Sequence, residues 1–557
     1  VLEVVMEVLI PFVMAELIDK GIDAQNMSAI GKYGFILVAC AMLALVFGAA
    51  AGTYAARAST GFARNLRHDM YYAVQDFSFS NIDKFSTGSI VTRLTTDVTN
   101  VQNAFQMCTR IAVRCPVMLI FAFVMAAKIN RNMALIFVAV LPVLAIGLGI
   151  LMKMVGPVFE RVFKIYDRLN TVVQENVHGI RVVKAYVRED HEAEKFENVS
   201  ELLYRTFSKA QKTLACNMPL MQFCMYACML LVSWFGARLI VSGSMTTGEL
   251  TSMFSYIMQI LTSLMMVAMV FVMITMAKAS AERVAELLSE KPDLHNPAQP
   301  VCEVKDGSID FDAVDFSYKG DEHKLALRDV NLHIYSGQTI GILGCTGSAK
   351  STLVQLIPRL YDTSRGTVRV GGKDVRAYDL AALRDAVNII LQKNVLFSGT
   401  VRENLKWGNV DASDEEIWEA CRAACADEFL NRMPDGLDTV LEQGASNLSG
   451  GQKQRLCIAR ALIGKAKILI FDDSTSAVDT ATEKKIREAL AARKDVTKII
   501  IAQRVTSVMN TDQIIILDDG KVHRIGTHAE LLADDPIYQE IYASQMKGGD
   551  ENGSESL

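Results

Sequence analysis

A nine-residue run in the second half of the chain has the residue types and spacing of a loop that holds phosphate. The run follows the apolar segment Thr339–Leu343, opens an expected helix at Lys350, and comprises Gly344, Cys345, Thr346, Gly347, Ser348, Ala349, Lys350, Ser351 and Thr352. In such a strand–loop–helix unit, backbone N–H groups and the helix N-terminus hold phosphate oxygens. Lys350 would pair with the terminal phosphates of a nucleotide, and the Ser351 hydroxyl would ligate Mg²⁺.

The loop departs from the usual G-x-x-x-x-G-K-[ST] pattern at one position, where Ala349 replaces the second glycine. Glycine is usual there because the backbone comes close to phosphate and can take a positive φ. The added methyl group would be absorbed if φ stays negative, and would otherwise loosen the cradle. Nucleotide affinity therefore depends on the backbone conformation at Ala349.

Polar residues with catalytic potential recur further along the chain. The run Leu448–Gln452 reads Leu-Ser-Gly-Gly-Gln, and the apolar run Ile468–Asp473 ends in two aspartates. Gln392 precedes both runs, and Ser476–Asp479 follows them. In this order the motifs resemble those of an ATP-binding cassette. Because apolar stretches long enough to cross a bilayer precede them, the whole chain resembles one half of an exporter-type ABC transporter.

The resemblance implies a role for each matching residue. Tyr318 corresponds to the aromatic residue that stacks on adenine, and Gln392 to the glutamine that reaches Mg²⁺ and relays the nucleotide state toward the membrane helices. Asp472 corresponds to the Walker B carboxylate, which holds Mg²⁺ through water, and Asp479 lies in the loop that crosses to a partner cassette. The implied cofactors are ATP and Mg²⁺, with Ser351, Gln392 and Asp472 around the metal ion.

Two catalytic positions differ from those of family members that hydrolyse ATP efficiently. Asp473 stands where a glutamate follows the Walker B aspartate, and its carboxylate, one methylene shorter, should reach or polarise the attacking water poorly. Gln503 stands where a histidine contacts the γ-phosphate, and a glutamine cannot carry positive charge. The intact run would instead complete the active site of a partner through Ser449, Gly450, Gly451 and Gln452.

In this family two cassettes enclose two ATP molecules, each held by the phosphate loop of one subunit and the Leu-Ser-Gly-Gly-Gln run of the other. A homodimer of this chain would have two impaired sites, whereas a heterodimer would keep one competent site. The motifs therefore favour half of a heterodimeric exporter of amphipathic drugs or lipids, with a partner that retains the catalytic Glu and His. A nucleotide-sensing regulatory subunit, an exporter-fold importer or lipid flippase, and functionally neutral drift at Asp473 and Gln503 are the alternatives.

Composition separates these motifs from a membrane-embedded first half. The 557 residues are 51% hydrophobic with a mean hydropathy of +0.22, and the excess is confined to the first 280 or so. A net charge of −5 gives no indication of nucleic acid binding. Methionines gather in the last two spans, where they suit a cavity for varied apolar ligands or ordinary helix packing.

Six apolar stretches are long enough to cross a bilayer, near residues 1–19, 33–56, 111–129, 132–155, 217–242 and 249–277. The long polar stretches between the second and third and between the fourth and fifth are rich in Arg and Lys, which places them and both termini in the cytoplasm. Within them, Phe77–Ser89 and Gly179–Ala185 resemble the short coupling helices that plug into nucleotide-binding domains. Arg110 and Arg114, at the cytosolic end of the third span, would snorkel to the membrane edge or contact an anionic substrate or lipid headgroup.

The pattern predicts two domains of different fold class. An all-α six-helix transmembrane domain is expected over residues 1–290 and an α/β P-loop nucleotide-binding domain over 309–546, joined by a proline-containing linker at 291–308. A disordered Gly/Ser/Glu-rich tail is expected at 547–557. We therefore expect a multi-pass protein of the cytoplasmic membrane whose nucleotide-binding domain lies in the cytoplasm.

Overall fold

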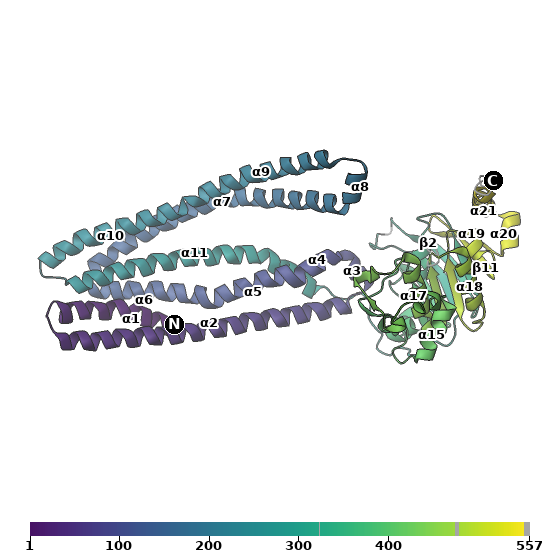
Figure 1. Ribbon diagram of the computed structural model, residues 1–557, viewed down its shortest axis with the longest axis horizontal. Helices are drawn as coiled ribbons and strands as arrows, with labels where there is room; N and C mark the ends of the chain where they lie inside the picture. Colours follow the sequence, from purple (N-terminus) through teal and green to yellow (C-terminus); the bar gives the residue numbers. More distant parts are fainter. Residues whose placement is uncertain (322, 474–477, 551–557) are drawn as a thin grey trace. The chain divides into compact units, whose positions relative to one another are not determined.

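The computed structural model describes residues 1–321, 323–473 and 478–550. They fold as two compact units, one made of residues 1–73 and 88–289 and the other of residues 74–87 and 290 onward. Long helices form the first unit, whereas sheets covered by helices form the second (Figure 1). The predicted fold class, a helical transmembrane domain followed by an α/β P-loop domain, is confirmed.

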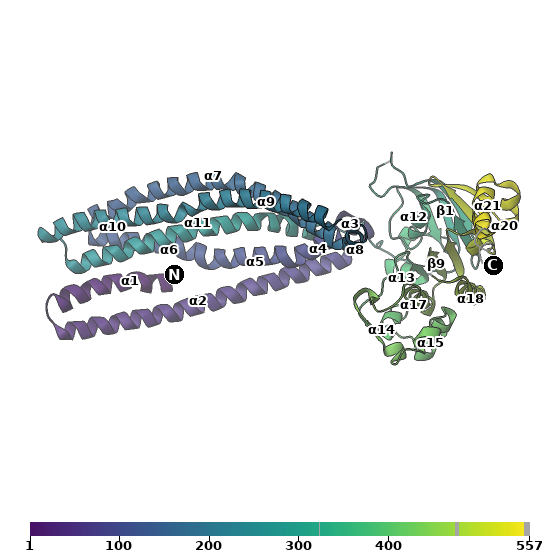
Figure 2. The same ribbon diagram turned by 45° about the horizontal axis from the view of Figure 1, so that its top comes forward.

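The helices of the first unit run alongside one another in both views (Figures 1 and 2). Three five-residue π-helical segments, η1 to η3, interrupt the α-helices. In chain order the elements are α1 (Leu2–Leu17), η1 (Ile18–Ile22), α2 (Met27–Asp76), α4 (Thr87–Thr92), η2 (Arg93–Asp97), α5 (Val98–Met107), η3 (Cys108–Ala112), α6 (Val113–Ile129), α7 (Arg131–His178), α8 (Ile180–Ala185), α9 (Glu189–Ala215), α10 (Asn217–Val241) and α11 (Thr247–Ser289).

Five continuous helical stretches among the described residues are long and apolar enough to cross a membrane: Met27–Asp76, Thr87–Ile129, Arg131–His178, Glu189–Val241 and Thr247–Ser289. They contain five of the six predicted spans. The remaining predicted span, at 1–19, lies in the continuous helical stretch of α1 and η1, Leu2–Ile22, which carries the charged residues Glu3, Glu7, Glu16, Asp19 and Lys20. Helix α1 packs against α6 and α11 and so belongs to the same bundle.

Ion pairs between helices neutralise charged side chains of the bundle. Arg114 Nη2 donates to both carboxylate oxygens of Glu7, at 2.6 and 2.7 Å, and lies 3.8 Å from a carboxylate oxygen of Glu3. Arg114 is thus paired with α1 while its side chain stays 38% exposed, so snorkelling and contact with an anionic ligand remain predictions. Arg93 and Glu286 join η2 to α11 in the same way, at 2.7 Å. Such pairing is the usual condition for an ionisable side chain within a membrane-spanning bundle.

Both segments predicted to be short coupling helices are helical. Helix α8 connects α7 to α9 at one end of the first unit (Figure 1). Helix α3 (Phe79–Lys84) belongs instead to the second unit. There, Asn81 Nδ2 donates to Glu290 Oε1 at 2.9 Å, and Lys84 Nζ pairs with Glu290 Oε2 at 2.5 Å. A segment that the sequence assigned to the transmembrane domain therefore packs with the nucleotide-binding unit.

Two main sheets build the second unit. The larger has the order β12-β11-β3-β10-β9-β6 and is parallel except at β12, and the smaller is an antiparallel sheet of order β2-β1-β4-β5. The predicted strands at Ser308–Tyr318, Leu325–His333 and Thr339–Leu343 form the first three strands. The bounds are β1 (Ile309–Phe316), β2 (Leu327–Ile334), β3 (Thr339–Leu343), β4 (Arg365–Val370), β5 (Lys373–Asp374), β6 (Val387–Ile390), β7 (Gly399–Thr400), β8 (Val440–Leu441), β9 (Ile468–Asp472), β10 (Thr497–Ile501), β11 (Gln513–Asp518) and β12 (Lys521–Gly526).

Helices cover these sheets, and α12 begins at Lys350 as predicted. Helix α21 runs past the expected domain end at 546, and residues 551–557 of the expected tail lie outside the described residues. The bounds are α12 (Lys350–Gln355), α13 (Leu380–Ala386), α14 (Val401–Leu405), α15 (Asp414–Ala423), α16 (Asp427–Leu430), α17 (Gly450–Ile463), α18 (Thr480–Ala491), α19 (Val505–Val508), α20 (His528–Asp534) and α21 (Pro536–Asp550).

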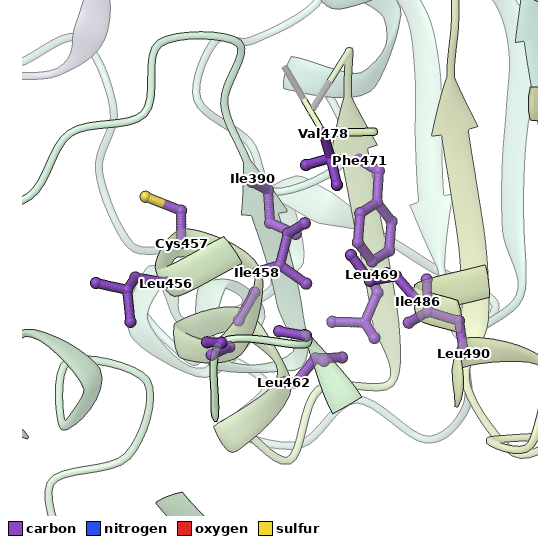
Figure 3. Packing of buried hydrophobic residues seen from close by; sticks show 14 of the residues in the cluster. Ile390, Leu456, Cys457, Ile458, Leu462, Leu469, Phe471, Val478, Ile486 and Leu490 are labelled. Atoms are coloured by element: carbon purple, nitrogen blue, oxygen red, sulfur yellow. The ribbon is translucent and has the colours of Figure 1, made fainter. Parts of the chain in front are cut away.

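The larger sheet is buried on both faces, as expected of parallel strands. All five residues of β9 and of β10 are buried. Figure 3 shows Ile458 of α17 among apolar side chains of the strands, including Ile390 of β6 and Phe471 of β9. This packing fixes α17, and therefore the Leu448–Gln452 run at its start, against the sheet.

Ile458 tests this contact because it is fully buried. We expect Ile458→Ala to lower the free energy of unfolding by about 2–5 kcal/mol, and Ile458→Val by only about 0.5–1.5 kcal/mol, because the first leaves a larger cavity. Thermal unfolding of the purified chain in detergent measures both. Equal effects of the two substitutions would show that this position is not tightly packed.

Candidate functional site

Four neighbouring parallel strands end at one edge of the larger sheet, and each leads into a residue that the sequence singled out. Strand β3 leads into the loop that begins at Gly344, β10 is followed by Gln503, β9 ends at Asp472, and β6 is followed by Gln392. Ile501 of β10 lies in register with both Asp472 of β9 and Ile342 of β3. Since ligands of open parallel sheets bind at the carboxyl ends of the strands, the sequence pattern and the topology select the same edge.

The phosphate loop curls around the ammonium group of Lys350. Lys350 Nζ donates to the carbonyl oxygens of Gly344 at 2.7 Å and Cys345 at 2.8 Å. Burial lowers the pKa of Lys350, against the opposing influence of Cys345, Asp473 and Asp472. A Cβ at Gly344 would lie 2.3 Å from the carbonyl oxygen of Leu517, so only glycine fits there. The loop therefore holds a cation at its centre, as a phosphate cradle requires.

Ala349 adopts a backbone conformation that favours glycine. It precedes α12 with φ +69° and ψ +26°, in the left-handed region. For a residue with a Cβ this conformation costs roughly 1–2 kcal/mol. Because φ is positive, the methyl group of Ala349 introduces local strain into the loop.

Ser351 and Asp472 offer adjacent oxygen atoms for a metal ion. Ser351 Oγ donates to Asp472 Oδ1 at 2.8 Å, and Asp472 is 3% exposed. Mg²⁺ prefers such hard oxygen ligands, so this pair fits the implied ion. Burial raises the pKa of Asp472, with a further increase from Asp473 and a decrease from the Ser351 bond. The side chain of Gln392 is exposed, and within the described ranges no hydrogen bond joins it to either residue.

Asp473 and Gln503, the two altered catalytic positions, are in direct contact. Gln503 Nε2 donates to Asp473 Oδ2 at 2.8 Å, and Asp473 N–H donates to the Ile501 carbonyl at 3.1 Å. Burial raises the pKa of Asp473, while the Gln503 bond lowers it. The structure thus brings together two residues that lie 30 positions apart in the chain.

The Leu448–Gln452 run caps its own helix. Ser449 Oγ accepts from Gln452 N–H at 3.3 Å, and Gln452 Oε1 accepts from Ser449 N–H at 2.8 Å, which forms a capping box at the start of α17. The Ser449 hydroxyl proton is not used in this box and can be donated to an anion. Ser449 and Gly450 are exposed, and nothing lies within 4 Å of a Cβ built at Gly450.

The motif run and the phosphate loop of the same chain stay apart. Within the described ranges, no hydrogen bond or ion pair joins residues 448–452 to residues 344–352 or 472–473. Asp479 caps α18 by accepting from Thr482 N–H at 3.0 Å, and the preceding Ser476 and Ala477 lie outside the described residues.

An aromatic pair beside the loop includes one residue that sequence reasoning missed. Tyr318 is 48% exposed, and its hydroxyl lies 2.9 Å from Thr352 Oγ1. The ring of Tyr361 meets it edge-on, with centroids 5.2 Å apart. Tyr361 donates its hydroxyl proton to Asp83 of α3 at 2.6 Å. Tyr361 and Asp83 are 278 positions apart, so no local sequence pattern could have paired them.

Known proteins resemble both halves of this chain. Residues 1–265 match the family described as ABC transporter transmembrane region, and residues 327–476 match the family described as ABC transporter. The chain is 37% identical to the uncharacterized ABC transporter ATP-binding protein YfiB of Bacillus subtilis, over 100% of this chain and 96% of that protein. It is 31% identical to the ATP-dependent lipid A-core flippase of Desulfotalea psychrophila, over 88% and 85% of the two chains.

A solved structure, described as a bacterial Atm1-family ABC exporter with ATP bound, has a similar fold. The TM-score is 0.81 at 23% sequence identity, over 98% of this chain and 97% of that one. The likeness extends through both units, so the same architecture underlies the helical part and the cassette.

The strain at Ala349 gives a prediction about stability. We expect Ala349→Gly to raise the free energy of unfolding by about 0.5–1 kcal/mol, because relief of the left-handed strain exceeds the entropy cost of glycine. Ala489→Gly, in the last turn of α18 where the backbone is helical, should instead lower it, by up to about 1 kcal/mol. Thermal unfolding without nucleotide measures both, and a similar destabilisation by the two changes would contradict a positive φ at position 349.

The raised pKa of Asp472 gives a prediction about pH. Only the ionised carboxylate holds Mg²⁺, so affinity should be full above the pKa and be lost as the pH falls through it. Because burial raises that pKa, the loss should occur at a higher pH than for an ordinary aspartate. Titration of Mg²⁺-dependent ATP binding between pH 7.5 and 5 measures the midpoint.

A matched control is the exposed Asp518, which ends β11 of the same sheet. Asp518→Asn should leave the titration unchanged, whereas Asp472→Asn should remove the part that Asp472 contributes and leave the part due to the terminal phosphate of ATP. If wild type and Asp472→Asn gave the same titration between pH 7.5 and 5, the burial argument would be refuted.

Proposed function

The chain belongs to the ABC transporter family, and from this premise we propose that it is one half of a heterodimeric exporter of amphipathic molecules. Members of this family couple ATP to transport across a lipid bilayer, and the chain carries one transmembrane domain and one cassette. The observation that carries the proposal is the direct contact of Asp473 with Gln503, in a chain whose Leu448–Gln452 run is intact.

The local site is proposed to bind Mg²⁺ and ATP. Tyr318 would stack on adenine, Lys350 would pair with the terminal phosphates, and Ser351 with Asp472 would hold the metal ion, which Gln392 would reach in the closed state. When bound, Mg²⁺ would neutralise charge on the phosphate oxygens. Lys350 already lies within the loop, so phosphate can replace the two carbonyl oxygens that its ammonium group now contacts.

Hydrolysis at this local site is proposed to be slow. A general base must reach the proton of the attacking water, and the Asp473 carboxylate is one methylene shorter than glutamate. One of its oxygens is also occupied by Gln503 Nε2 at 2.8 Å. Gln503 is neutral, so it stabilises the charge that develops on the phosphoryl group less than a protonated histidine would.

The exposed start of α17 is proposed to complete a second site on the partner subunit. The Ser449 hydroxyl proton is available, and the open surface at Gly450 lets a phosphate approach the backbone. The N-terminus of this 14-residue helix also favours an anion. The partner would supply the phosphate loop together with the catalytic Glu and His, so that one of the two ATP molecules turns over efficiently.

Nucleotide binding is proposed to reach the membrane helices through α3. A ring that stacks on Tyr318 would press on Tyr361, and Tyr361 is bonded to Asp83 of α3. Helix α3 lies in the chain between the end of α2 and the start of α4, so its movement is transmitted covalently to both. Such a link would let ATP binding favour one of the two transport states.

A lipid substrate is the more specific variant of the proposal. The relative that is 31% identical to this chain is named as a lipid A-core flippase. The last two helices of the bundle also expose flexible apolar side chains such as Met218 and Met269, which suit varied acyl chains as well as drugs.

Paired substitutions test the division of labour. In a heterodimer purified with its partner, we expect Ser449→Ala to reduce ATP turnover by about 10²-fold or more, because it removes a donor to the transferred phosphate. Asp473→Asn should change turnover less than twofold, since the local site contributes little. ATPase assays in nanodiscs measure both. Ser446→Ala, an exposed serine just before the Leu448–Gln452 run, is the control and should leave ATP turnover unchanged.

Equal losses from Ser449→Ala and Asp473→Asn would refute the asymmetric assignment. A chain that turns ATP over rapidly without any second subunit would refute the heterodimer itself.

A further inference from the structure

The carboxyl-terminal helix α21 is hydrogen-bonded to the main chain at Gln503 and Val505. Gln545 Nε2 donates to the main-chain carbonyl of Gln503 at 2.8 Å, and Gln545 Oε1 accepts from the main-chain N–H of Val505 at 2.8 Å. A single side-chain amide thus bonds on both sides of Arg504. The segment that it spans connects the end of β10 to the start of α19.

The bond to Val505 satisfies a group that the segment cannot satisfy by itself. Val505 is the first residue of α19, so its N–H has no partner within the helix. Arg504 precedes the helix and makes no capping bond with its side chain. Gln545 therefore caps α19 from a distant part of the chain, the task that Ser, Thr or Asn usually performs locally.

Helix α21 is anchored well enough to act as a support. Tyr538 is fully buried, its N–H donates to Asp535 Oδ1 at 2.8 Å, and its hydroxyl lies 2.6 Å from His528 Nδ1. Gln545 follows Tyr538 by seven residues, about two helical turns, so both point to the same side of α21. Ile541, between them, packs against the same apolar core as Val505.

We propose that Gln545 is a positioning residue for ATP hydrolysis at the local site, acting through Gln503. Three hydrogen bonds form a continuous chain from α21 to the altered catalytic pair: Val505 N–H to Gln545, Gln545 to the Gln503 carbonyl, and Gln503 Nε2 to Asp473. With both ends of its backbone segment fixed, Gln503 presents its amide to Asp473 in one orientation. The inference rests on the proposed function only in taking Asp473 and Gln503 as the hydrolytic pair.

This arrangement gives the carboxyl-terminal helix control over the local site. Movement of α21 away from α19 would break both Gln545 bonds and release the segment that carries Gln503. The rate of hydrolysis would then change while the residues that bind ATP, on β3 and α12, keep their places. We therefore expect an effect on kcat rather than on KM.

Gln545→Met tests the proposal because it keeps the length of the side chain and removes both bonds. The full-length chain is reconstituted in nanodiscs without a second subunit, so that every ATP site contains the Asp473–Gln503 pair. The expected result is a fall in kcat of about two- to tenfold, the loss of one or two ordinary hydrogen bonds, with an unchanged KM for ATP. In a Gln503→Ala background, Gln545→Met should have no further effect.

Gln539→Met is the matched control on the same helix. Gln539 Nε2 donates to the carbonyl oxygens of Leu532 and Ala533, at 2.9 and 3.1 Å, and so ties α21 to α20 without touching the Gln503 segment. This control should leave kcat unchanged. An equal fall in kcat for both Gln variants, or an undiminished effect of Gln545→Met in the Gln503→Ala background, would overturn the proposal.

Gln545→Glu keeps the test decisive if Gln545→Met also lowers the unfolding temperature. A glutamate still accepts from Val505 N–H, and so still caps α19, but it cannot donate to the Gln503 carbonyl. As for Gln545→Met, the effect of Gln545→Glu on kcat should disappear in the Gln503→Ala background. The turnover of the wild-type chain in nanodiscs without a second subunit tests the proposed heterodimer separately. Rapid turnover would refute the heterodimer, but the coupling of Gln545 to Gln503 could still be measured.

Discussion

Parallel hydrogen bonding of β10 to both β3 and β9 places chemically different segments of the chain at one edge of the sheet. The register that sets Ile501 beside Asp472 on one side and Ile342 on the other aligns the phosphate loop, Gln503 and the two aspartates. A slip of one residue would turn each of these side chains to the other face. All five residues of β9 and all five of β10 are buried, which makes such a slip costly. The core of the cassette therefore specifies the geometry of its site.

The edge tolerates backbone strain where the chemistry requires it. Ala349 adopts φ +69° and Asp473 φ +48°, both in the region that residues with a Cβ rarely occupy. Such conformations persist where the surrounding structure over-determines them. Here the flanking strands β3 and β9 are hydrogen-bonded on both sides, and Ser351 is bonded to Asp472 across the gap between them. The two strained residues therefore lie where the flanking strands hold the backbone on both sides.

Residues outside the recognised motifs support this edge from two directions. On one side Tyr361 joins the exposed ring of Tyr318 to α3, which lies between two helices of the transmembrane domain in the chain. On the other side Gln545 joins α21 to the segment that carries Gln503. The site is therefore linked within the second unit both to α3 and to the carboxyl-terminal helix α21.

The sequence by itself determined the fold class, the phosphate loop from Gly344 to Thr352, the strand that leads into it and the helix that begins at Lys350, because all of these depend on local pattern and spacing. The same local reasoning left the conformation of Ala349 open and did not find Glu7, the partner of Arg114, which lies more than 100 positions away. Only the tertiary structure decided which charges pair, that residues 74–87 pack with the cassette, and that Tyr361 and Gln545 bear on the site. Contacts between residues so distant in the chain are set by how helices and sheets pack, and that packing leaves no periodicity or motif in the sequence of either partner.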